Sequence, residues 1–74
     1  MPKRVLLGQV WRKEGTDEDY LVTRVGKEVF SSFAVMRKVG DEERPSVRIT
    51  IKKIADGISL PGYIYTQEEN TGNP

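Results

Sequence analysis

The chain of 74 residues contains no cysteine and no histidine. Without cysteine, no disulfide can brace the fold, and no thiolate can act as a nucleophile or a metal ligand. Without histidine, imidazole-based zinc sites, Ser-His-Asp triads and Cys-His pairs are excluded as well. The acidic runs lack the spacing of a calcium loop, and no glycine-rich phosphate loop is present. We therefore expect no metal, no cofactor and no catalytic residues.

Long hydrophobic runs are also missing. The apolar stretch in the opening segment MPKRVLLGQVW is only a few residues long. It is too short for the core of a signal peptide and far too short to cross a bilayer. We therefore expect no membrane partner and a cytoplasmic location, in which a chain without cysteine is ordinary.

The length allows one small domain, which should bury roughly 60% of the surface of its unfolded chain. We expect this domain to span residues 1–66. The segment that follows is polar, ends in Gly-Asn-Pro and has no apolar anchor. It is therefore predicted to be a disordered tail over residues 67–74.

Opposite charges nearly cancel in the whole chain but are unevenly distributed. There are twelve lysines and arginines and eleven aspartates and glutamates. The acidic residues gather in KEGTDEDY and GDEERP, whereas the basic residues lie mostly in or beside strand-like runs. A local basic surface is therefore expected despite a net charge of +1.

The clearest structural pattern is the alternation in SVRITIKKI, residues 46–54. Val47, Ile49 and Ile51 fall on one side of this run, and polar residues fall on the other, which is typical of a half-buried strand. Polar or glycine-containing turns separate four further strand-length runs: residues 4–12, 20–25, 29–39 and 58–66.

Residues 28–39 fit two interpretations. Val29, Phe33 and Met36 lie at helical spacing, so a helix over this segment would give an α+β fold. The centre of the run, VFSSF, contains no strong helix former, and we favour a strand. That strand would place one set of apolar residues on a common face: Val29, Phe33, Val35 and Val39.

Five short strands joined by tight turns can bury their apolar faces by curling into a barrel. The fold class is accordingly predicted as all-β: a small, antiparallel, strongly bent five-stranded barrel. The order GQVW, YLVTRV…AVMRKVG, PSVRITIKKIADG and GYIYT resembles the Src-homology-3-like barrels, over residues 7–66. This resemblance implies a binding scaffold that uses exposed strands and loops.

Basic residues form the first candidate site. Arg48 and Lys52 share one face of the alternating strand, and Lys53 lies at its end. Arg37 and Lys38 belong to the preceding strand, which should pair antiparallel with it. Such cations could neutralise phosphates, although an ordinary solvated strand face would have the same composition.

Trp11 is the candidate for stacking on a base, because Arg12 and Lys13 follow it directly. The competing interpretation is packing, since a small domain needs its large side chains in the core. On that ground Phe30 and Phe33 are also expected in the core.

The leading functional hypothesis is a non-catalytic binding or adaptor module. Nucleic acid is its most concrete ligand, through Arg37, Lys38, Arg48, Lys52 and Lys53 with Trp11. The first alternative is a protein-interaction module that pairs through an exposed edge strand, either with a partner or as a homodimer. The second is a minimal ribonuclease-like enzyme.

Overall fold

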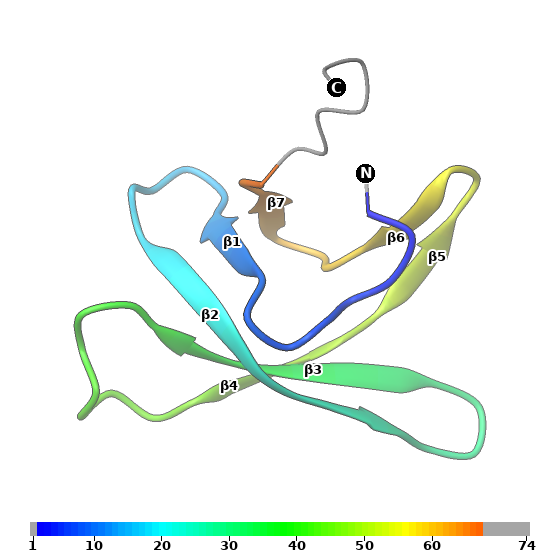
Figure 1. Cartoon of the computed structure of the whole chain (residues 1–74), viewed down its shortest axis with the longest axis horizontal. Helices are drawn as coiled ribbons and strands as arrows, with labels where there is room; N and C mark the ends of the chain where they lie inside the picture. Colours follow the sequence, from blue (N-terminus) through cyan, green and yellow to red (C-terminus); the bar gives the residue numbers. More distant parts are fainter. Residues whose placement is uncertain (1, 68–74) are drawn as a thin grey trace.

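The computed structural model describes residues 2–67 and contains seven strands in this part of the chain. In chain order they are β1 (Val10–Lys13), β2 (Asp19–Lys27), β3 (Ser32–Lys38), β4 (Val47–Thr50), β5 (Lys52–Ile54), β6 (Gly57–Ser59) and β7 (Tyr63–Tyr65). Five strands form one sheet in the order β4-β3-β2-β1-β7, and β5 pairs with β6 in a separate hairpin. The larger sheet is antiparallel throughout and curls through 197° into a half-barrel (Figure 1).

The predicted all-β class is therefore confirmed, and the alternative helix over residues 28–39 is wrong. β3 occupies the centre of that segment and pairs with β2 on one side and with β4 on the other. These two ladders satisfy the backbone groups of β3 that a helix would have satisfied internally. No helix among residues 2–67 is long and apolar enough to cross a membrane.

The alternating run SVRITIKKI is interrupted once. β4 ends at Thr50 and β5 begins at Lys52, in a different sheet. Ile51 joins the two strands, and its N–H still donates to the Ser32 carbonyl over 2.9 Å. The break turns the chain from the edge of the large sheet toward the β5–β6 hairpin (Figure 1).

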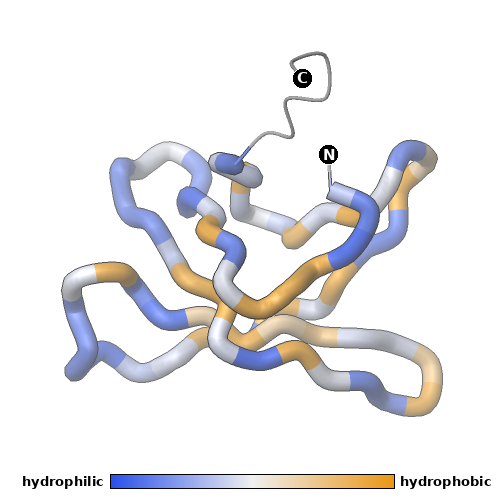
Figure 2. The backbone as a smooth tube through the Cα atoms, in the orientation of Figure 1, coloured by the Kyte–Doolittle hydropathy of each residue, from blue (hydrophilic) through white to orange (hydrophobic). Residues whose placement is uncertain are grey.

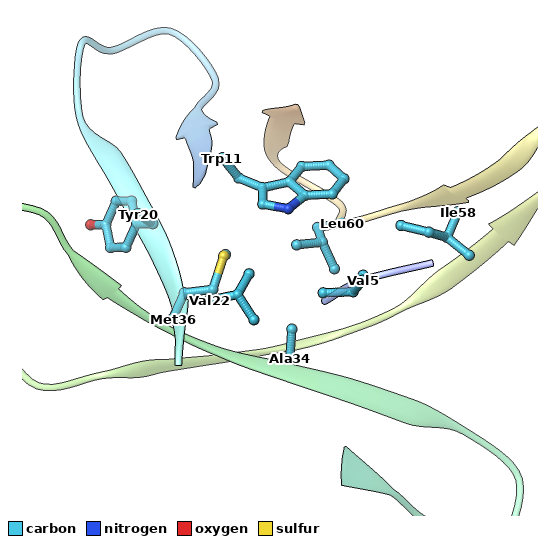
Figure 3. Close-up of a cluster of buried hydrophobic side chains, with 8 residues drawn as sticks. All are labelled: Val5, Trp11, Tyr20, Val22, Ala34, Met36, Ile58 and Leu60. Atoms are coloured by element: carbon cyan, nitrogen blue, oxygen red, sulfur yellow. The ribbon is translucent and has the colours of Figure 1, made fainter. Parts of the chain in front are cut away.

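The core fills the concave side of the half-barrel (Figure 3). Eight apolar side chains form it: Val5, Trp11, Tyr20, Val22, Ala34, Met36, Ile58 and Leu60. Val47, Ile49 and Ile51 pack against this cluster, as the alternation predicts. The predicted first strand over residues 4–12 is wrong in its beginning, since β1 starts only at Val10, but Val5 is buried as part of a loop.

The core-facing side of β3 also differs from the prediction. Ala34 and Met36 are fully buried, whereas Phe33 and Val35 lie on the opposite, convex side of the sheet. Phe33 packs over Gly26, its partner across β2, where only a residue without a side chain leaves room for the ring. The small Ala34 on the concave side leaves space for the larger core side chains.

A bulge in β2 decides which of its side chains reach the convex side. The register with β3 shifts between Val22 and Arg24, so that Thr23 is the additional residue. Leu21 lies opposite Arg37 before the bulge, and Arg24 lies opposite Val35 after it. Because bulges redirect side chains, Arg24 faces the convex side instead of following Val22 into the core.

The domain boundary predicted at residue 66 lies close to the end of the described chain. Gln67, assigned to the tail from the sequence, accepts a hydrogen bond from the Val10 N–H through its side-chain oxygen, over 3.0 Å. The rest of the predicted tail, residues 68–74, lies outside the residues that the structure describes.

Candidate nucleic-acid interface

Charges of opposite sign are separated along the long β2–β3 hairpin. Seven of the nine carboxylates in residues 2–67 lie in or beside the loops at its open end: Glu14, Asp17, Glu18, Asp19, Asp41, Glu42 and Glu43. We call this region the acidic end. Arg44 joins the β1–β2 loop to the β3–β4 loop, since its guanidinium lies 3.7 Å from Glu18 and 3.4 Å from Asp41. Arg44 is therefore engaged by carboxylates from both loops.

Arg12 is a second paired cation at the acidic end. The Nε atom of Arg12, in β1, lies 2.9 Å from Oδ1 of Asp19, the residue opposite it in β2. This hydrogen bond and the charge of Asp19 raise the pKa of the Arg12 guanidinium. The pair is exposed, so it contributes little to stability, but it leaves Arg12 less free to bind another anion.

A groove lies at the other end, between the tip of the β2–β3 hairpin, the β5–β6 hairpin and the N-terminal segment. Its volume is about 1010 Å³, and Val5, Val25 and Ile58 provide apolar lining. Five cations line it: Lys3, Arg4, Lys27, Lys52 and Lys53. We call it the basic groove. None of the five forms an ion pair within residues 2–67.

The N-terminal segment brings Lys3 and Arg4 to the basic groove, and two hydrogen bonds hold it there. The Ile58 N–H donates to the Pro2 carbonyl over 3.0 Å, which joins the segment to β6. Nε2 of the buried Gln9 donates to the Arg4 carbonyl over 3.2 Å. The backbone positions of both cations are therefore fixed, while their side chains are exposed.

Lys52 and Lys53 come from the β5–β6 hairpin on the other side of the groove. They pair with Ser59 and Ile58 across the hairpin, and a two-residue turn at Ala55 and Asp56 closes it. Because the chain turns at Ile51, these two lysines lie in the groove rather than beside Arg48 on one strand face.

One carboxylate, Glu28, lines the basic groove. The Arg48 guanidinium forms an ion pair with its Oε2, and the Ser31 hydroxyl donates to its Oε1 over 3.5 Å. Arg48 itself belongs to the convex side of the sheet. Arg48, which lies outside the groove, therefore neutralises the charge of Glu28, and the five groove cations keep their excess of positive charge.

Two exposed apolar residues, Val29 and Phe30, form the tip of the β2–β3 hairpin and line the rim of the groove. Val29 is 86% exposed and Phe30 is 97% exposed, so the prediction of Phe30 as a core residue is wrong. A tight turn shapes the tip, since the Glu28 N–H donates to the Ser31 carbonyl over 2.7 Å. Figure 2 shows this hydrophobic tip projecting from the body of the molecule. An exposed aromatic ring beside cations is a platform on which a base can stack.

The structure divides the site residues predicted from the sequence. Lys52 and Lys53 lie in the basic groove, whereas Arg37 and Arg48 lie on the convex side. Lys38 lies opposite Tyr20, on the concave side of β3 toward the acidic end. Arg37 and Lys38 are consecutive in β3, so their side chains fall on opposite faces of the sheet.

Trp11 has no exposed surface, so it cannot stack on a base in this fold. Its ring packs with that of Tyr65 at a centroid distance of 5.1 Å, and its indole N–H donates to Oε1 of Gln9 over 3.3 Å. The packing interpretation describes this residue, and the stacking role suggested for it is wrong. The aromatic side chain that is exposed for stacking is Phe30, not Trp11.

Arg24, Arg37 and Arg48 surround Val35 on the convex side, and we call them the arginine face. Arg24 and Arg48 lie directly opposite Val35 on its two neighbouring strands, and Arg37 is two residues further along β3. The guanidinium of Arg48 lies 3.9 Å from the centre of the Phe33 ring. The sequence alone did not identify Arg24 as a site residue, because strict alternation puts its side chain on the same face as Val22, toward the core. The two consecutive polar residues Thr23 and Arg24 are the signal that the alternation breaks there.

Lys3, Arg4 and Lys27 were also missed as groove residues. They lie far from residues 46–54 in the sequence, and only the fold brings them to the β5–β6 hairpin. No group of three or more acidic residues among positions 2–67 is arranged to hold a metal ion.

Comparison with known proteins gives no match, whether to a family model, to a curated protein or to a solved structure.

Proposed function

We propose that this chain is a non-catalytic binding module that holds single-stranded nucleic acid in the basic groove. The observation that carries this proposal is the convergence, beside an exposed phenylalanine, of five cations that form no ion pair with any other residue in the range 2–67. The cations come from three separate segments of the chain, so the fold is required to gather them.

Electrostatics supports a polyanionic ligand. Phosphates that contact lysine or arginine release condensed counterions, which makes binding favourable and strongly dependent on salt. The basic groove contains five cations, and its one carboxylate is engaged by Arg48. The carboxylates at the acidic end lie at the far end of the β2–β3 hairpin (Figure 1). A phosphate backbone can therefore occupy the groove without meeting an uncompensated negative charge there.

The exposed ring of Phe30 supports a single strand over a duplex. Bases of a single strand present their faces for stacking, and one such contact contributes about 1–3 kcal/mol. In a duplex those faces are covered by neighbouring base pairs. The groove, about 1010 Å³, is also at the upper limit of pockets that enclose small molecules, and it suits a segment of an extended polymer.

Fluorescence anisotropy with a labelled oligothymidylate of about 16 nucleotides tests the proposal at two salt concentrations. Lys52→Gln/Lys53→Gln should weaken binding about tenfold or more and reduce the slope of log K against log salt by about 1.4, or about 0.7 for each lost phosphate contact. Phe30→Ala should weaken binding about tenfold with the salt slope unchanged, because stacking releases no counterions.

A charge-matched control is the double variant Lys13→Gln/Lys38→Gln. It removes the same two positive charges near the acidic end, outside the groove. Binding should remain within about twofold of the unchanged protein at moderate salt. Lys38 lies at the opposite end of β3 from Ser32 at the hairpin tip, about 20 Å away at the rise of a strand, which exceeds a Debye length of about 10 Å. Equal losses in the two double variants would mean that only the total charge matters. Tighter binding of a duplex would refute the preference for single strands.

An edge-strand interaction is the second candidate, favoured by one observation. Among the described residues, β4 pairs only with β3, and Ile51 and Ser32 form a hydrogen-bonded position of that ladder. By the alternation of antiparallel pairing, the N–H groups of Arg48 and Thr50 point away from β3. A peptide strand or a second copy of the chain could pair there. Sedimentation at several protein concentrations tests the homodimer, which should depend little on salt and be lost in Thr50→Pro.

The Src-homology-3-like type supports either binding role, since such barrels expose strands and loops to their ligands. Within this proposal the chain acts in the cytoplasm and catalyses no reaction. A ribonuclease would degrade a labelled oligouridylate incubated with the protein in place of the oligothymidylate, which gel electrophoresis of the recovered RNA would show.

A further inference from the structure

We propose that the arginine face is a second phosphate-binding surface, which receives the continuation of the single strand held in the basic groove. This inference rests on the proposed function and extends it. Arg24, Arg37 and Arg48 then take part in binding longer nucleic acids, and the nucleic acid passes around the tip of the β2–β3 hairpin.

The first argument is the charge of the arginine face. Arg24, Val35 and Arg48 form one row across three adjacent strands, and Arg37 lies in the next position on the same side of β3. Adjacent strands are about 4.8 Å apart, so three guanidinium groups share a small area. Arg24 and Arg48 lie on either side of β3, about 10 Å apart at the backbone, and Arg37 lies diagonal to both. An anion on this surface could therefore contact more than one of these cations.

The second argument is the shortage of carboxylates nearby. Arg12 and Arg44, at the acidic end, are both paired with carboxylates. Within residues 2–67, Arg24 and Arg37 have no carboxylate within ion-pair distance, and both side chains are exposed. They are therefore free to form the bidentate contacts with phosphate for which the guanidinium group is suited.

The third argument is the fixed position of Arg48. Its guanidinium lies over the Phe33 ring at 3.9 Å and forms an ion pair with Glu28. Phe33 in turn packs on Gly26 across the sheet. Because Arg48 stays paired with Glu28, it shields that carboxylate from a passing phosphate, and the contacts to phosphate on this face come from Arg24 and Arg37.

The fourth argument is continuity between the two surfaces. Glu28 lines the basic groove, and the arginine that neutralises it belongs to the arginine face. The remaining residues at the hairpin tip are basic, neutral or apolar: Lys27, Val29, Phe30, Ser31 and Ser32. No uncompensated carboxylate lies along this part of the hairpin. A phosphate backbone that leaves the groove past Glu28 therefore reaches Arg48 first.

Binding of short and long strands tests the inference. The probes are labelled oligothymidylates of about 4 and about 16 nucleotides, the range of site sizes typical of small nucleic-acid barrels. Arg24→Gln/Arg37→Gln should leave the affinity for the short probe within about twofold. It should weaken the long probe about tenfold and lower the salt slope for it by about 1.4. Arg24→Lys/Arg37→Lys should keep the salt slope, because the charges remain.

The matched control is Arg12→Gln/Arg44→Gln, which removes two arginines at the acidic end and should affect neither probe. On the unchanged protein, the long probe should shift the amide resonances of Arg24, Val35 and Arg37, and the short probe should not. Loss of short-probe binding in Lys52→Gln/Lys53→Gln, with no effect of Arg24→Gln/Arg37→Gln on either probe, would overturn this inference and leave the proposed function intact. Dependence of the long probe on the arginine pair alone would refute the groove and, with it, the continuation of the nucleic acid from the groove to the arginine face. If neither probe binds, both proposals fail.

Discussion

The indole N–H of Trp11 donates a hydrogen bond to Oε1 of Gln9 over 3.3 Å, inside the core. The same amide donates from Nε2 to the Arg4 carbonyl over 3.2 Å. One buried side chain thus joins the largest core residue to the backbone of a cation in the basic groove. The arrangement couples the stability of the core to the placement of the N-terminal segment.

Gln9→Leu should destabilise the domain by about 1–3 kcal/mol, because it leaves the buried indole N–H without an acceptor. Urea unfolding followed by the fluorescence of Trp11, the sole tryptophan of the chain, measures this loss. Gln67→Leu is the control, since its hydrogen bond to the Val10 N–H is exposed and its loss should cost clearly less. Equal losses in the two variants would show that the buried amide has no special role.

Gly57→Ala should detach the N-terminal segment from β6. Gly57 has φ of +151°, and a Cβ there would overlap the Pro2 carbonyl oxygen, which accepts the Ile58 N–H. Gly40→Ala is the matched control, because Gly40 also has positive φ, +86°, but faces open space. The control should cost about 1–2 kcal/mol from backbone strain, and Gly57→Ala should cost more. Faster hydrogen exchange of the Ile58 amide in Gly57→Ala alone would confirm the detachment.

Gly26→Ala should displace the Phe33 ring from the convex side of the sheet. An added Cβ would overlap that ring directly, so the ring must move, at a cost of about 1–3 kcal/mol. Its movement removes the surface on which Arg48 lies. In NMR spectra, the ring-current shift of the residue 26 α-proton should shrink in the variant. Val25→Ala, at the neighbouring position, should leave the resonances of Phe33 and Arg48 in place; a large change there would count against a specific effect of Gly26.

The stability of the domain should fall at alkaline pH. Burial raises the pKa of the Tyr63 hydroxyl, and neighbouring Tyr20 and Glu18 raise it further. The unfolded chain therefore loses this proton at lower pH, near the ordinary tyrosine value of about 10, and binds fewer protons than the folded chain above that pH. The free energy of unfolding should decrease from there until the folded-state pKa is passed. Tyr63→Phe should reduce the decrease measured by urea unfolding; an unchanged pH dependence would show that Tyr63 is not its source.

Period-two alternation predicted much of the fold from the sequence. It identified the buried side of β4 and the pairing of β3 with β4. These features depend on local geometry, because successive side chains of a strand point to opposite faces. The same rule failed at Arg24, since a bulge adds one residue and reverses the alternation beyond it.

Features that depend on distant contacts could not be predicted in this way. Phe33 lies on the convex side because Gly26 leaves space for its ring, and that pairing is visible only in the register of β2 and β3. Phe30 is exposed because the tight turn at the hairpin tip carries it beyond the core. Lys3 and Lys52 line the same groove only because the N-terminal segment docks on β6.

Within residues 2–67, the gathering of seven carboxylates at the acidic end and five cations in the basic groove gives this part of the molecule a permanent electric dipole, although the net charge of the whole chain is only +1. In the field of a polyanion, such a molecule turns so that the β2–β3 tip leads. Productive encounters should then be more frequent than random tumbling allows, and added salt should slow association by screening this torque.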